Sequence, residues 1–141
     1  MVENYKFRPF AHPVIVLVDN DEGSNAVFSV VKEVFKPTTI TKTSTAPFYH
    51  LVHNLYLVKT PEIGAAGTSC IEDMYEKKVQ RRLLGGKKFS RKKNLDVEKE
   101  YGKKVFAKKV IRQNLNTTKF DNFKPLLDRI SAVIAHYKPP A

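Results

Sequence analysis

The feature that most constrains the fold is an apolar run, Val14 to Val18, that ends abruptly in Asp19-Asn20-Asp21-Glu22-Gly23. A short, continuous, β-branched run is typical of a parallel strand that is buried on both faces. After Ser24, apolar residues recur at helical spacing until Pro37, at Val27, Val30, Val31, Val34 and Phe35. The sequence therefore predicts a strand, an acidic turn and a helix, as in an open α/β sheet.

The rest of the chain predicts two further short strands and three further helices. The strands, at residues 48–52 and 55–58, form a hairpin around His53-Asn54. The helices cover residues 71–83, 96–113 and 122–137, the last with Pro125 in its first turn. A length of 141 residues favours one domain, with an α/β core of about three strands at 1–84, a basic connector at 85–95 and a helical C-terminal part at 96–141.

The acidic turn is the first candidate site. Ligands bind in open α/β sheets beyond the carboxyl ends of the strands, where Asp19 and Asp21 would lie. Two carboxylates, with waters and phosphate oxygens, are the usual ligands of Mg²⁺. The alternative is that Asp19 ends the strand and Asp21 caps the helix.

A receiver-like phosphorelay domain also places paired acids after its first strand. Such a domain needs a further aspartate at the end of a later strand. Here the strand at 55–58 ends in Lys59-Thr60-Pro61, which disfavours that class.

Glu72 and Asp73 are the second acidic pair and would complete a metal site if their loop returns to the same crevice. The competing interpretation is a capping box, Ser69-x-x-Glu72, with Asp73 complementing the helix dipole. The preceding Gly64 to Ser69 segment lacks the lysine of a nucleotide-binding loop, so we expect a plain connection.

Three other reactive side chains favour ordinary structural roles. His50 and His53 would point to opposite faces of a strand, which argues against a shared metal. Cys70 is the only cysteine and has no evident base partner, so we expect it in the core. A single cysteine, with no signal peptide or membrane-length apolar run, favours the cytoplasm and no membrane partner.

The positive charge is concentrated in one segment. Residues 77–109 hold 14 Lys or Arg and 3 acids, a net +11 that equals the charge of the whole chain. Such a concentration is typical of phosphate-backbone contacts, whereas a solvated helix face is the alternative for any single lysine. Phe89 could stack on a base or anchor into the core. The candidate contacts are Lys77, Lys78, Arg81, Arg82, Lys87, Lys88, Arg91, Lys92, Lys93, Lys103, Lys104 and Lys108, and Lys88 and Lys92 could also stabilise charge during phosphodiester cleavage.

Four segments stand out together: Val14 to Gly23, Asn54 to Val58, Cys70-Ile71-Glu72-Asp73 and Phe120 to Leu127. In combination they resemble the C-terminal region of retron reverse transcriptases that carry a Toprim-like domain. The resemblance implies a partial Rossmann-like sheet in which Asp19 and Asp21 hold Mg²⁺ or Mn²⁺. It also implies an accessory role in phage defence, with DNA, RNA or an RNA–DNA hybrid and the reverse transcriptase portion as partners.

The chain departs from the Toprim pattern at its start. Only thirteen residues precede Val14, and the family's first strand and its glutamate are not among them. Either the chain is a fragment of a longer polypeptide, or Glu72 and Asp73 replace the lost ligand, or the fold is a degenerate one that binds without catalysing a reaction.

Three functions follow as hypotheses. The first is a Toprim-like module that binds nucleic acid and cleaves phosphodiesters with Mg²⁺. The second is a non-catalytic module that docks nucleic acid or protein, and the third is a pure protein-interaction domain. The chain has no polymerase motif, so we do not expect it to copy RNA.

Overall fold

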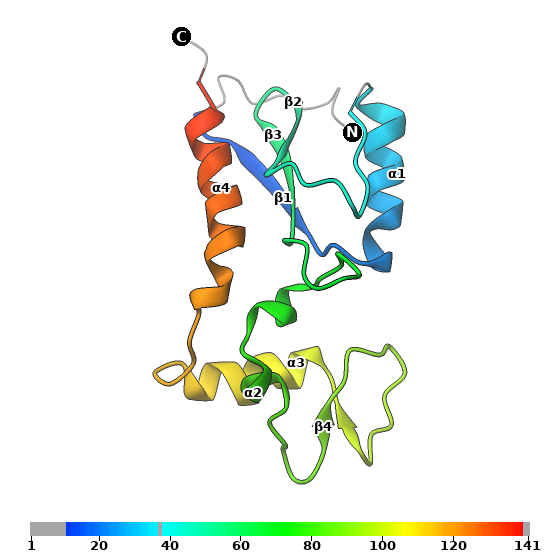
Figure 1. The fold of residues 1–141 in the computed structure, drawn as a ribbon, viewed down its shortest axis with the longest axis vertical. Coiled ribbons are helices and arrows are strands. Elements are labelled where there is room, and N and C mark those ends of the chain that lie inside the picture. The colour runs from blue at the N-terminus through cyan, green and yellow to red at the C-terminus, as the bar shows by residue number, and fades with distance from the viewer. Residues whose placement is uncertain (1–10, 37, 140–141) are drawn as a thin grey trace. The chain divides into compact units, whose positions relative to one another are not determined.

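The chain forms two compact units (Figure 1). A computed structural model describes residues 11–36 and 38–139. Unit 1 joins the chain up to Cys70 with the chain from Lys124 onward, and unit 2 is the intervening Ile71–Phe123. Unit 2 is therefore an insertion in the sequence of unit 1, and it spans the predicted basic connector with parts of both flanking segments.

Unit 1 contains a three-stranded mixed sheet in the order β1-β3-β2. β1 (Val14–Val18) runs parallel to β3 (Leu55–Lys59), with Val14 opposite Leu55 and Val18 opposite Lys59. β2 (Tyr49–Val52) pairs antiparallel with β3. The turn between them places His53 at a φ of 50°, in the left-handed region. These strands confirm the α/β class, the parallel first strand and the hairpin.

Two helices cover opposite faces of this sheet (Figure 1). Successive residues of a strand point to opposite faces, so Leu57 packs against Phe28 and Val31 of α1 (Asn25–Val34). Its neighbours Tyr56 and Val58 pack against α4 (Lys124–His136). Both helices were predicted from apolar residues at helical spacing, and the structure confirms them. Pro125 lies in the first turn of α4, as expected.

The expectation that β1 is buried on both faces was wrong. Val14, Val16 and Leu17 remain 39%, 40% and 41% exposed, because β1 lies at the edge of the sheet in the described chain. β3 is the central strand instead, with Leu57 and Val58 at most 1% exposed. A continuous apolar run thus marks both an edge strand and a central one here.

Unit 2 begins with short turns in place of the long helix predicted at 71–83. A 3-10 turn covers Ile71–Met74, and α2 covers only Lys77–Gln80, because Glu76 between them is extended with ψ of 144°. The predicted connector is also partly ordered as a strand, β4 (Lys88–Phe89). Gly85 and Gly86 both take positive φ in the turn that leads into it.

The helix predicted at 96–113 begins later than expected. β5 (Glu100–Tyr101) pairs in parallel with β4, and this pairing keeps residues 100–101 extended. The helical segment then runs as α3 (Lys103–Val105), a π-helix over Phe106–Ile111 and a 3-10 turn over Arg112–Asn114. The core of unit 2 consists of Tyr101, Phe106, Val110 and Ile111, with Tyr75, Val79, Leu84 and Phe89 packed around them.

Candidate functional sites

The acidic turn is fixed by Asn20, which is fully buried at the carboxyl end of β1. Its backbone N–H donates to the hydroxyl of Thr60 and the carbonyl of Ser69, both at 2.8 Å. Its side-chain amide donates to the carbonyls of Lys42 at 3.0 Å and Gly67 at 2.8 Å. Sequence reasoning gave Asn20 no role, although it is the residue that holds the turn.

Asp19 and Asp21 flank this anchor and are both half-buried. Residues i and i+2 of an extended segment share one side of the backbone, so we expect the carboxylates of Asp19 and Asp21 to lie on the same side. Asp21 also accepts a 2.8 Å hydrogen bond from the N–H of Gly23, as a helix cap does. Capping and metal binding are compatible, because the cap uses one carboxylate oxygen. Two carboxylates on one side fit the partial protein ligand set that Mg²⁺ commonly takes.

Glu72 and Asp73 belong to unit 2 and have cationic partners there. Glu72 is buried and lies 3.0 Å from the ammonium of Lys103. Asp73 accepts two hydrogen bonds from the guanidinium of Arg91, at 2.6 and 3.0 Å. These pairs neutralise both carboxylates.

The predicted capping box at Ser69 was wrong. The Ser69 hydroxyl donates to the carbonyl of Pro61 and to the hydroxyl of Thr60, because Ser69 lies in the buried polar cluster around Asn20. Among the described residues, no group of three or more His, Cys, Asp or Glu side chains could hold a metal ion. A cation at Asp19 and Asp21 would therefore take further ligands from water or from a phosphate.

A buried ionic network adjoins the end of β3. The Lys59 side chain is fully buried, lies 2.7 Å from the Glu62 carboxylate, and donates to the Lys42 carbonyl at 2.6 Å. Arg129 of α4 donates to Glu62 at 2.6 Å and to the carbonyl of Lys59 at 3.0 Å. Burial raises the pKa of Glu62, but the hydrogen bonds from Lys59 and Arg129 outweigh burial and leave that pKa below its ordinary value. The sequence signal was a lysine that ends an apolar strand.

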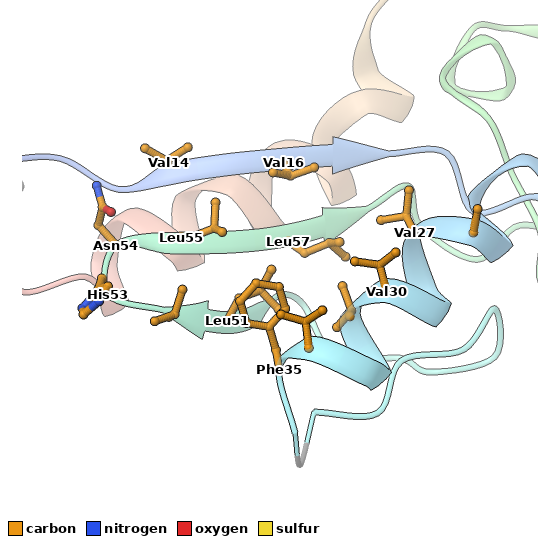
Figure 2. A pocket seen from close by; sticks show the side chains of 14 residues that line it. Val14, Val16, Val27, Val30, Phe35, Leu51, His53, Asn54, Leu55 and Leu57 are labelled. Atoms are coloured by element: carbon orange, nitrogen blue, oxygen red, sulfur yellow. The ribbon is translucent and has the colours of Figure 1, made fainter. Parts of the chain in front are cut away.

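An apolar groove of about 860 Å³ lies between α1 and the sheet (Figure 2). Val16 and Leu57 line its sheet side, and Val30 lines its helix side. Of the described residues that line the groove, only His53 and Asn54 are polar, so this lining supplies neither a set of metal ligands nor a lysine or arginine for a phosphate.

The predicted basic residues fall into two groups. The first group lies in ion pairs with acids of unit 2, which lowers the charge available for a ligand. Its members are Lys77 with Asp73 at 3.9 Å, Lys78 with Glu76 at 2.9 Å, Arg91 with Asp73 at 2.6 Å, Lys92 with Glu100 at 3.8 Å and Lys103 with Glu72 at 3.0 Å.

The second group carries no ion pair to another residue in the described part of the chain. It comprises Arg81, Arg82, Lys87, Lys88, Lys93, Lys104 and Lys108, with Lys109, Arg112 and Lys119 in addition to those predicted. All but Lys87, which donates to the carbonyl of Val97, are exposed. These side chains are the ones available to an anionic ligand.

Three cations of the second group form a stripe, Lys104, Lys108 and Arg112, along the helical segment of unit 2. Their spacing of four residues brings them to nearly one side of the helix. Phe106 and Val110, at 1% exposure each, occupy the buried side. Sequence reasoning missed Arg112, although its place one turn beyond Lys108 would have indicated it.

No protein-family model matches this chain, and no solved structure matches it. Among the described residues, no helix has both the length and the apolar character needed to cross a membrane. The fold and the charges define a small α/β unit that carries a basic insertion.

Proposed function

We propose that this chain binds nucleic acid through the exposed cations of unit 2. The observation that carries the proposal is the charge asymmetry between the units. Unit 2 has 16 Lys and Arg against 7 Asp and Glu, so it accounts for +9 of the net +11. Its acids Glu72, Asp73 and Glu100 are already paired, and the surplus therefore lies on side chains that face solvent. A dense phosphate backbone is the ligand class that such a surplus attracts.

The resemblance to Toprim-like retron domains supports the same proposal. In that setting the module would serve a retron reverse transcriptase in phage defence, holding DNA, RNA or their hybrid for the polymerase portion of a longer polypeptide. The alternative of a module that docks protein alone predicts no salt-dependent binding to any nucleic acid.

The stripe variant Lys104→Gln, Lys108→Gln, Arg112→Gln tests this proposal. Each phosphate contact contributes about 0.9 to the slope of log K against log salt on duplex DNA, so we expect the slope to fall by about 2 to 3. Fluorescence anisotropy with a labelled DNA between 50 and 200 mM salt would measure it.

The matched control is Lys32→Gln, Lys36→Gln, Lys138→Gln, which removes the same charge from exposed positions of unit 1. We expect the control to keep most of the slope of log K against log salt. If both triple variants lose the slope equally, net charge drives the binding and the stripe has no special role.

A second candidate function, Mg²⁺-dependent phosphodiester cleavage, rests on the anchoring of Asn20. That anchor fixes the backbone between Asp19 and Asp21 beyond the carboxyl end of β1, and these two carboxylates would hold the cation. Bound Mg²⁺ polarises a phosphate and lowers the pKa of its water. The two predicted assisting cations, Lys88 and Lys92, belong to unit 2, where Lys92 is paired with Glu100 and Lys88 is exposed.

The variant Asp19→Asn, Asp21→Asn tests the cleavage proposal while preserving side-chain shape. We expect Mg²⁺-dependent nicking of supercoiled DNA to fall by at least about 100-fold, since one charge is removed from each ligand. Glu22→Gln, in the same turn, is the control and should nick normally. Undiminished nicking by the double variant would show that the turn is only a cap.

A further inference from the structure

We infer that unit 2 prefers the phosphate backbone of a nucleic-acid duplex to a single strand. The inference rests on the proposed function and deepens it by naming the form of the ligand. It depends on where the aromatic rings of unit 2 lie, and on which cations remain exposed.

Single-strand binding without sequence preference normally combines cations with aromatic rings on which bases stack. Each stacked base contributes about 1 to 3 kcal/mol. Unit 2 has six aromatic residues, and the question is whether any ring face is available for a base. They are Tyr75, Phe89, Tyr101, Phe106, Phe120 and Phe123.

Three of these rings form the centre of the core of unit 2. Phe89 stacks on Phe106 with ring centroids 4.4 Å apart. This contact favours the predicted role of Phe89 as an anchor in the core over a role in stacking on a base. Tyr101 is 5% exposed and its hydroxyl donates to the carbonyl of Arg82.

The other three rings pack against one another at the edge of that core. Tyr75 meets Phe106 edge-on at 5.6 Å and Phe123 at 4.9 Å. Phe120, the most exposed ring at 42%, lies 5.9 Å from Tyr75 and 5.6 Å from Phe123. Every ring in this unit therefore contacts another ring, and stacking on a base would compete with these contacts.

The exposed cations must then supply the binding affinity. The affinity that they contribute depends on the charge density of the ligand. Duplex DNA presents one phosphate charge per about 1.7 Å of axis, whereas each strand alone presents one per about 3.4 Å. The salt slope per contact is also steeper for duplexes, about 0.9 against about 0.7. A binder that uses phosphate contacts without stacking gains more from the duplex.

The experiment compares one labelled 20-nucleotide DNA as a single strand and as a duplex, using the full chain and anisotropy at 50 to 200 mM salt. We expect the duplex to bind at least about 10-fold more tightly at 50 mM and to show the steeper slope. Exchanging the sequence for one of different base composition should change duplex affinity by less than about 2-fold, because phosphate contacts carry no sequence information.

Phe120→Ala is the discriminating variant, since Phe120 is the ring most open to a base. We expect the affinity of this variant for the single strand to stay within about 2-fold of that of the unaltered chain. Equal or tighter binding of the single strand, or a 10-fold loss of single-strand binding in Phe120→Ala, would overturn the duplex preference while leaving nucleic-acid binding intact. If neither DNA binds, both the preference and the proposed function fail.

Discussion

Replacement of Glu62 by alanine is expected to destabilise unit 1 by about 3 to 5 kcal/mol, the usual cost of removing one partner from a buried ion pair. The Lys59 side chain has no exposed surface, so the variant leaves its charge in the interior without a counterion. Arg129 loses the same partner. Urea unfolding, followed by hydrogen exchange of the β1 and β3 amides, would measure the change.

Asp128→Ala is the control, because it breaks an exposed pair with Lys124 on α4. Exposed pairs of this spacing contribute about 0.5 kcal/mol or less. A loss in Glu62→Ala no larger than in Asp128→Ala would mean that Lys59 reaches water or another acceptor.

The same carboxylate predicts an acid dependence of stability. Burial raises the pKa of Glu62, and the hydrogen bonds from Lys59 and Arg129 lower it by more, so the folded pKa lies below the ordinary value of 4.5. A group with a lowered folded pKa stabilises fully above its unfolded pKa, and this contribution is lost as the pH falls through the folded pKa. Unfolding free energy should therefore decline below about pH 4.5, and the decline should be shallower in Glu62→Gln. Identical profiles would contradict the assignment.

Replacement of Phe106 by alanine is expected to unfold unit 2 and abolish nucleic-acid binding. Phe106 is 1% exposed and contacts the rings of both Phe89 and Tyr75, so its removal should cost about 3 to 5 kcal/mol. A unit this short is stabilised by only a few kcal/mol in total. The amides of unit 2 should lose their protection from hydrogen exchange, while those of β1 and β3 stay protected.

Leu115→Ala is the matched control for this variant, since Leu115 lies in the same unit and is 53% exposed. It should keep both protection and binding. Binding of the Phe106 variant at the original affinity, with unit 2 unfolded, would show that the cations act as a disordered chain.

Local periodicity was sufficient to predict much of unit 1. α1 and α4 followed from apolar residues at helical spacing, and the hairpin from two short apolar runs around His53-Asn54. The same reasoning failed in unit 2, where the pattern at 96–113 contained a strand. Pairing of β5 with β4 joins residues twelve positions apart, and it overrode the local helical preference.

By itself, the sequence determined the α/β class, the acidic turn after β1 and the location of the positive charge, because these depend on short-range pattern and composition. Only the tertiary structure decided which charges remain available to a ligand. Arg129 meets Glu62 across 67 positions, and Asn20 meets Gly67 across 47. Ion pairs and buried hydrogen bonds of this kind depend on which segments the fold brings together, and no local pattern encodes them.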